Sequence, residues 1–191
     1  NWCSTAYAIE GDAKEVKKLY KLMTKLQEQK EPSVKNGFGK TWLGCLVDAL
    51  GGDCNKVHCR GEWSNLEMVG EVLKFTTETA WSPCDETLEL VCNAFPTLNI
   101  YYQAEEPGIG LYCTNDLEGN YFPDKYIVDL CTPDDTWYKE YFSDLANLFG
   151  WFEEISGQPV KSIKEILAIT EQWSEENEDA FCGIYEFDIS D

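Results

Sequence analysis

The most informative absence in this 191-residue sequence is a long hydrophobic run. No stretch of about 18 apolar residues occurs, so we expect no membrane-spanning helix. Arginine and histidine each occur once, as Arg60 and His58. One guanidinium and one imidazole leave little material for bidentate recognition of phosphate or for a histidine-based catalytic set. No short period repeats, which excludes coiled-coil and solenoid folds.

Positive charge is scarce and unevenly distributed. The chain has 35 acidic and 15 basic side chains, for a net charge of -20. Residues 1–60 carry a net +3 and residues 61–191 a net -23, and no basic residue follows Lys164. Such a surface repels phosphate backbones and anionic headgroups, so we expect no direct nucleic-acid binding and no membrane binding. The acids either keep the protein soluble or attract a basic partner.

The nine cysteines do not form a disulfide framework. Their number is odd, their positions are scattered and no Cys-x-x-Cys pair occurs. Cys92 and Cys113 lie within apolar patterns, where a thiol behaves as a small buried hydrophobe. This usage predicts a reducing, cytoplasmic location.

Hydrophobic periodicity predicts alternating strands and helices over residues 1–115. Strand patterns cover residues 3–9, 57–64, 70–81, 98–105 and 109–113, and helix patterns cover residues 13–30, 42–50 and 83–95. We expect Ser82 to cap the last of these helices, with Pro83 in its first turn. Without the short helix and the last strand, the order is βαββαβ. The predicted fold class is therefore α+β with a ferredoxin-like core, an antiparallel sheet with helices on one face.

The remainder of the chain differs in composition. The pattern over residues 121–130 predicts one further strand, and residues 136–152 are dense in aromatic side chains. An amphipathic helix pattern contains Ile163 and Trp173, and a final short strand covers residues 182–189. We predict a ferredoxin-like domain over residues 1–130 and an acidic, aromatic-rich helical extension over residues 131–191. The apolar content of the extension predicts that it packs on the first domain.

Four short motifs in order resemble one known family. They are Asn1-Trp2-Cys3, Thr79-Ala80-Trp81-Ser82-Pro83, Phe95-Pro96, and Tyr102 with Glu106-Pro107-Gly108. Together they resemble the YubB-type ferredoxin-like family of bacterial, plasmid and phage proteins, over roughly residues 1–120. Chains of that family commonly begin with Met-Pro before Asn-Trp-Cys, which would explain why this sequence starts at Asn1 without a methionine. The resemblance implies the fold but no activity, because the family has no established catalytic residues.

Candidate metal and catalytic groups are incomplete. Cys54, His58 and Cys59, with Cys45 upstream, lack the second close pair that a zinc site needs, and Glu62 stands where a third iron–sulfur ligand would fall. A helix start at Cys84 would lower its thiol pKa, but the adjacent acids oppose that effect. We therefore predict no metal, no cofactor and no catalytic residue. An enzyme that pairs a cysteine with the single histidine stays an alternative.

The binding residues that we single out lie on the predicted sheet. Three tyrosines offer rings for stacking and two neighbouring acids offer charge: Tyr7, Tyr101, Tyr112, Glu105 and Glu106. The leading hypothesis is a noncatalytic binding or accessory protein that binds a protein partner through an acidic surface. Basic proteins are among the partners that such a surface would attract. A DNA mimic that acts on a host defence or DNA-handling factor is the alternative within the binding proteins.

Overall fold

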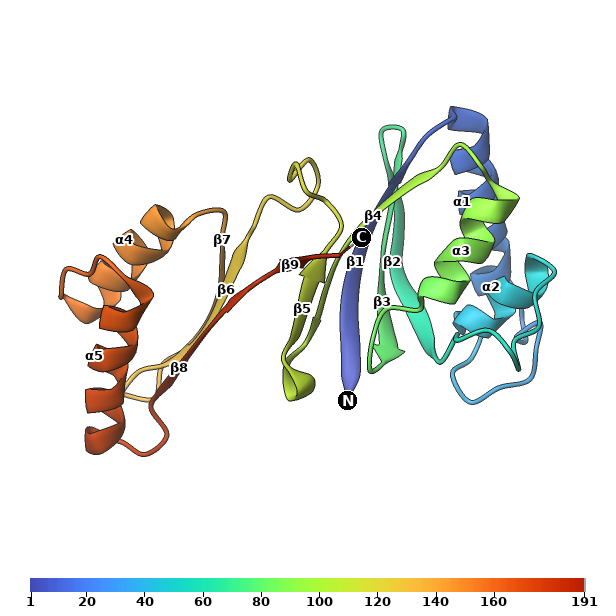
Figure 1. Cartoon of the computed structure of the whole chain (residues 1–191). Helices are drawn as coiled ribbons and strands as arrows, with labels where there is room; N and C mark the ends of the chain where they lie inside the picture. The colour runs from blue at the N-terminus through green and yellow to red at the C-terminus, as the bar shows by residue number, and fades with distance from the viewer. Residues whose placement is uncertain (191) are drawn as a thin grey trace. The chain divides into compact units, whose positions relative to one another are not determined.

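The computed structural model describes residues 1–190 and divides them into two compact units (Figure 1). Unit 1 comprises Asn1–Asp116 together with Ser190, and unit 2 comprises Leu117–Ile189. The sequence predicted a boundary after residue 130. The division falls after Asp116 because the strand that ends at Cys131 pairs with two strands of unit 2. The predicted packing of residues 131–191 on the first domain stays a prediction.

The larger sheet has six strands in the order β2-β3-β1-β4-β5-β9. Their bounds are β1 Trp2–Glu10, β2 Gly61–Val69, β3 Val72–Ala80, β4 Asn99–Glu106, β5 Leu111–Thr114 and β9 Asp188–Ile189. β1 pairs antiparallel with β3 and β4, β2 pairs antiparallel with β3, and β5 pairs antiparallel with β4. The fold is thus a mixed α/β arrangement in which the first strand of the chain is central.

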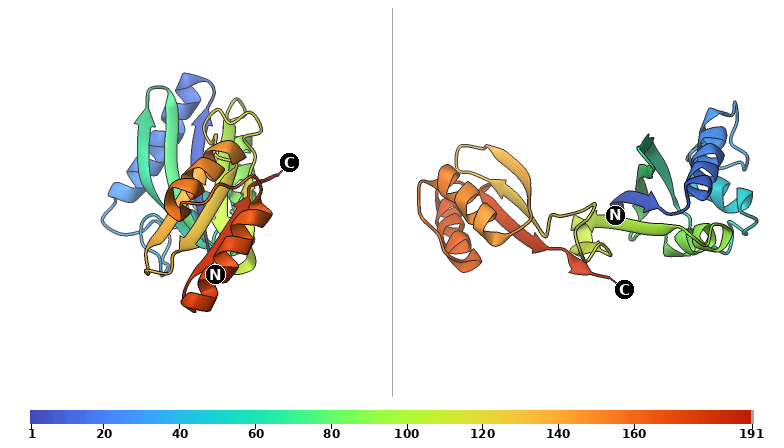
Figure 2. Two further views of the ribbon diagram at one scale, coloured as in Figure 1. Left: turned by 90° about the vertical axis from the view of Figure 1, so that its left-hand side faces the viewer. Right: turned by 90° about the horizontal axis from the view of Figure 1, so that it is seen from above.

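Three helices cover one side of this sheet (Figures 1 and 2): α1 Ala13–Glu28, α2 Leu43–Ala49 and α3 Asp85–Ala94. The Asp12 carboxylate caps α1 by accepting hydrogen bonds from the backbone N–H groups of Lys14 and Glu15. This helix has an apolar stripe that faces inward, because Val16 and Leu19 are buried. A short 3-10 helix, Pro107–Ile109, joins β4 to β5.

The core of unit 1 lies between the sheet and its helices. Successive residues of a strand point to opposite faces, and the odd-numbered positions of β1, from Cys3 to Ile9, are buried. Tyr7 stacks on Phe75 of β3 with ring centroids 4.8 Å apart. Hydrophobic side chains from α1, α2 and α3 complete this cluster.

The start of α3 differs from the sequence prediction. Ser82 is not its N-cap, because Cys84 occupies that position and the helix begins at Asp85. The intervening residues form a tight turn in which Trp81 has a left-handed backbone, with φ of 72°. The Thr79 hydroxyl donates a hydrogen bond to the Ser82 carbonyl at 2.8 Å and stabilises this turn. The chain therefore needs two more residues than predicted before it becomes helical.

Unit 2 is built on a three-stranded sheet in the order β7-β6-β8. Its elements are β6 Tyr126–Cys131, β7 Trp137–Phe142, α4 Leu145–Ser156, α5 Ile163–Glu176 and β8 Phe181–Glu186. Both pairings are antiparallel. α4 and α5 pack on one face of the sheet and bury Val128, Leu130 and Phe152. The aromatic-rich residues 136–152 therefore divide into a strand and a helix.

The chain returns to unit 1 at Ser190. Its backbone N–H donates a hydrogen bond to the Thr114 carbonyl at 2.9 Å. The hydroxyl oxygens of Ser190 and Tyr102 lie 2.7 Å apart and share a hydrogen bond. These contacts fix the residue beside β5.

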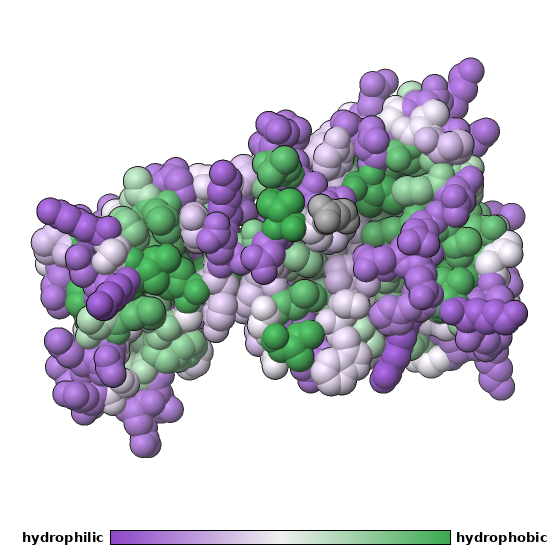
Figure 3. Space-filling model, in the orientation of Figure 1, coloured by the Kyte–Doolittle hydropathy of each residue, from purple (hydrophilic) through white to green (hydrophobic). Residues whose placement is uncertain are grey.

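The described residues contain no helix that is long and apolar enough to span a bilayer. The nine cysteines, all within this part of the chain, form no disulfide. Figure 3 shows apolar side chains at the surface among the hydrophilic ones.

Candidate binding site

The five residues predicted to bind a partner do not form one surface. Tyr7 is 3% exposed and faces the helices. Tyr101 and Tyr112 point to the opposite face, because Tyr101 pairs with Ala8 and Tyr112 pairs with Glu105. The Tyr101 hydroxyl donates a hydrogen bond to Glu10 at 3.3 Å. Of the predicted set, the strand register places Tyr101, Glu105 and Tyr112 on a common face.

Glu106 has a structural role. Its carboxylate is buried and accepts hydrogen bonds from the side-chain amide of Asn1 at 3.1 Å and from the backbone N–H of Gly108 at 3.1 Å. The second contact caps the short 3-10 helix that follows β4. Glu106 thus joins the start of β1 to the β4–β5 connection.

The loop with the single histidine packs against the start of α3. The backbone N–H of His58 donates a hydrogen bond to Glu86 at 2.6 Å, and the Thr87 hydroxyl donates one to the His58 carbonyl at 2.9 Å. The loop therefore lies beside Cys84, the N-cap of that helix. This arrangement brings the imidazole loop, thiols and carboxylates into one region, as the enzyme alternative requires.

The thiols of this region are poor nucleophiles. Burial, with the neighbouring Cys59 thiol and Asp85 carboxylate, raises the pKa of Cys84 to about 12. Burial and the neighbouring thiols raise the pKa of Cys59 to about 11. At neutral pH the Cys84 side chain is therefore a thiol, whereas a catalytic cysteine has a lowered pKa and reacts as a thiolate. The electrostatics therefore oppose the enzyme alternative.

The same region does not form a metal centre. Among residues 1–190 no three histidine, cysteine, aspartate or glutamate side chains are placed to hold one ion. Cys54, which is near Cys59, contributes its carbonyl rather than its thiol to the contact between them, accepting from the Cys59 thiol at 3.5 Å. The ligand types that the sequence brings together are thus not arranged around a shared position.

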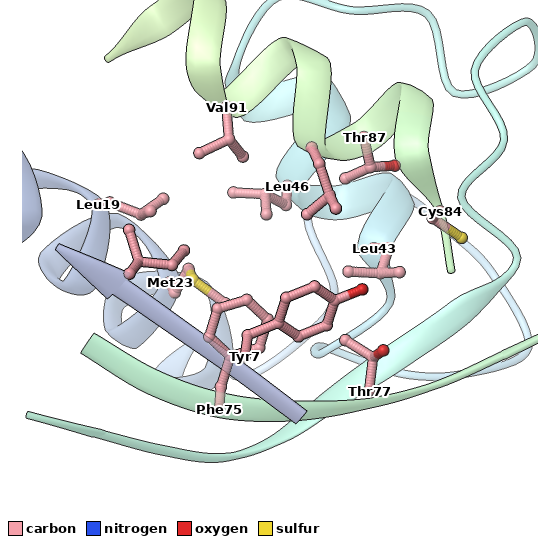
Figure 4. A pocket seen from close by; sticks show the side chains of 12 residues that line it. Tyr7, Leu19, Met23, Leu43, Leu46, Phe75, Thr77, Cys84, Thr87 and Val91 are labelled. Carbon is pink, nitrogen blue, oxygen red and sulfur yellow. The ribbon is translucent and has the colours of Figure 1, made fainter. Parts of the chain in front are cut away.

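A small cavity lies in unit 1 between the sheet and the three helices (Figure 4). Tyr7 and Phe75 line it from the sheet, and Leu46, Cys84 and Val91 line it from the helices. Its volume of about 10 Å³ admits about one water-sized molecule. Burial raises the pKa of the Tyr7 phenol, which keeps the phenol protonated. The cavity is part of a packed core and is too small for a substrate.

The strongest candidate for a binding surface is the second face of the unit 2 sheet. Three side chains of β7 point away from the helices, and two of them are the exposed aromatics Trp137 and Tyr141. Phe181 and Tyr185 of β8 occupy the matching positions across β6 and are also exposed. An exposed group of aromatic side chains on one face is typical of an interaction surface.

One end of this face combines aromatic and acidic side chains. Trp137 and Phe181 flank Cys131 in the strand register, and their ring centroids are 5.2 Å apart. They are 65% and 40% exposed. Burial and the carboxylates of nearby aspartates raise the pKa of the Cys131 thiol; these are Asp135, Asp179 and Asp134. We call Trp137, Phe181, Asp134, Asp135 and Asp179 the aromatic–acidic end.

Sequence reasoning missed this face, although a signal for it was present. Residues 137–142 alternate between Trp137, Lys139 and Tyr141 on one face and Tyr138, Glu140 and Phe142 on the other. A period of two indicates a strand with two different faces. The density of aromatic residues on both faces hides that period, because neither face is uniformly polar.

Unit 1 carries a smaller exposed aromatic group at the beginning of β1. Trp2 contacts Phe38 edge to face with ring centroids 6.0 Å apart, and the Arg60 guanidinium lies 5.9 Å from the Trp2 ring centroid. Trp81, which is 54% exposed, donates its backbone N–H to the Asn1 carbonyl. The exposed Trp2 ring thus already has a cation, Arg60, beside it. Among residues 1–190, the Trp137 ring of the aromatic–acidic end has no such cation.

Comparison with known proteins gives no relative for this chain. No family model, no curated protein and no solved structure matches it.

Proposed function

We propose that the chain is a noncatalytic binding or accessory protein that binds a basic protein through the acidic surface of unit 2. The observation that carries this proposal is the charge of that unit. Residues 117–189 hold 17 acidic side chains and four lysines, a net of -13. The raised pKa values of the Cys59 and Cys84 thiols support a function without catalysis.

Several carboxylates lie at the C-terminal end of α5, where the helix dipole disfavours negative charge. Glu171, Glu175 and Glu176 are exposed in its last turns, and no basic residue lies in the last turn. The C-terminus of a helix carries partial negative charge and favours cations. Carboxylates at this position lower stability, and a basic partner would offset that cost.

For the fold, we propose a ferredoxin-like core. Without α2, the elements β1-α1-β2-β3-α3-β4 follow the βαββαβ order, and their sheet order β2-β3-β1-β4 with antiparallel pairing supports that assignment. α2 and β5 are then additions to the core. Membership of the YubB-type family stays a prediction, and the odd number and scattered positions of the cysteines support a cytoplasmic location.

Binding of a labelled nine-arginine peptide, followed by fluorescence anisotropy, tests the proposed function. We expect binding at 50 mM NaCl that weakens about tenfold at 300 mM NaCl, because screening shortens the reach of the carboxylates. One variant neutralises four acids at the end of α5 and in the following loop: Glu171→Gln, Glu175→Gln, Glu176→Gln and Glu178→Gln. This variant should bind about tenfold more weakly.

A matched control neutralises four exposed acids of unit 1: Glu28→Gln, Glu31→Gln, Glu67→Gln and Glu71→Gln. It carries the same net charge as the first variant, so we expect a change of less than about threefold. Equal losses in the two variants, or no binding by the unmodified protein at low salt, would contradict the proposal. Displacement of a natural partner by duplex DNA would support the narrower hypothesis of a DNA mimic.

A further inference from the structure

Hydrogen bonds hold the segments of the aromatic–acidic end of unit 2 in place. The connection from β6 to β7 is a tight turn in which the Asp135 N–H donates to the Thr132 carbonyl and the Thr132 N–H donates to the Thr136 carbonyl, each at 3.0 Å. The side chain of Asn177, just after α5, donates hydrogen bonds to the Asp135 carboxylate at 2.9 Å and to the Pro133 carbonyl at 3.1 Å. Two segments from different parts of unit 2 are thereby held together.

These contacts leave charge beside an exposed ring. Asp134, Asp135 and Asp179 are exposed, and all three act on the buried Cys131 thiol, which lies between Trp137 and Phe181 in the register. Hydrogen bonds from Thr132 and Thr136 lower the pKa of Asp134, so that carboxylate is ionised at neutral pH. The site thus presents negative charge along the edge of an aromatic surface.

The same sheet face shows how such a surface binds a cation. Lys139 follows Trp137 by two residues along β7, and its ammonium lies 6.0 Å from the centroid of the Tyr141 ring. Trp137 is the more exposed ring, and no lysine or arginine of residues 1–190 is stacked on it. Indole is the aromatic side chain that attracts cations best. A cation supplied by another molecule can therefore lie over the Trp137 ring in the same way as the Lys139 ammonium lies over the Tyr141 ring.

We propose that the aromatic–acidic end binds the guanidinium group of an arginine side chain presented by a basic protein segment. The guanidinium stacks on the Trp137 ring and its N–H groups donate hydrogen bonds to the neighbouring aspartates. Arginine suits this position better than lysine because its planar group stacks on rings and forms paired hydrogen bonds with carboxylates. This inference rests on the proposed function and names the chemistry of the partner.

The experiment compares Trp137→Ala with Trp81→Ala, a matched loss of an exposed tryptophan in unit 1. The probes are labelled peptides of nine arginines and of nine lysines, followed by fluorescence anisotropy at 50 mM NaCl. Trp137→Ala should weaken binding of the arginine peptide about two- to fivefold, the typical effect of losing one cation–π contact at an exposed site. Trp81→Ala should leave this affinity unchanged, and the unmodified protein should bind the lysine peptide more weakly than the arginine peptide.

A second variant, Trp137→Phe, keeps the apolar surface and guards against loss of folding. It should retain part of the affinity, since benzene attracts a cation less than indole does, and circular dichroism should match that of the unmodified protein. Unchanged arginine-peptide affinity in both Trp137 variants would overturn the inference. If the four-acid variant of α5 still binds weakly in that case, the proposed function stands without it. No binding of either peptide to the unmodified protein would reject both.

Discussion

At the scale of single residues, Cys84 shows how position in the fold controls a thiol. It precedes the first turn of α3, where the partial positive charge of a helix lowers a thiol pKa. Its side chain is nevertheless buried, and Cys59, Asp85 and Glu86 all disfavour a negative charge there. Burial is the largest effect, so the pKa rises to about 12. The structure uses this cysteine as part of the core.

This raised pKa predicts a loss of stability at alkaline pH. The unfolded thiol loses its proton near pH 9 and the folded thiol near pH 12, so the unfolded state gains stability as the pH rises between these values. The stability difference between the unmodified protein and Cys84→Ala should fall by roughly 1–2 kcal/mol between pH 8 and pH 10.5. Urea unfolding under reducing conditions measures it, and a difference independent of pH would contradict the assignment.

At the scale of elements, acidic side chains have opposite effects on helix stability at the two ends of α5. Near its start, the Ser162 hydroxyl caps the helix, and the Glu165 carboxylate accepts a hydrogen bond from the Lys161 N–H at 2.7 Å. At its other end, Glu175 and Glu176 lie where the helix dipole repels anions. The first arrangement stabilises the helix and the second opposes it.

Neutralising acids at the two ends of α5 should therefore change the free energy of unfolding in opposite directions. Glu175→Gln with Glu176→Gln should raise the free energy of unfolding of unit 2 by about 0.5–1 kcal/mol at low salt. Glu165→Gln, the matched control, should lower it because a charge near the positive helix end is lost. Urea unfolding followed by circular dichroism measures both, and a change of the same sign in the two variants would count against this account.

The elements that the sequence predicted best are those with one clear periodicity. The apolar stripe of α1 and the alternation of β3 each have one buried face, so they indicate both the type of element and its orientation. The predicted start of α3 was wrong because the left-handed turn at Trp81 leaves no signal in the pattern of apolar and polar residues. The aromatic–acidic end was missed because it joins residues 134–137 to residues 179–181, which only the tertiary fold brings together.

At the scale of the whole molecule, the net charge of -20 acts on folding itself. Like charges in a compact state repel one another, and salt screens that repulsion. Raising NaCl from 10 mM to 150 mM should therefore raise the midpoint of thermal unfolding by a few degrees. The four-acid variant of α5 should gain less, and a midpoint that falls with salt would contradict this expectation.

The hydrogen bond between Ser190 and Thr114 has a consequence for chain connectivity. Thr114 lies two residues before the end of the first segment of unit 1, and Ser190 is where the chain rejoins that unit. Unit 2 is therefore an insertion whose entry and exit points are neighbours on the same scaffold. A short turn that joins Asp116 directly to Ser190 would excise the inserted module and leave every strand from β1 to β4 with its native neighbours, while β5 would lose β9 and become the edge strand of the sheet.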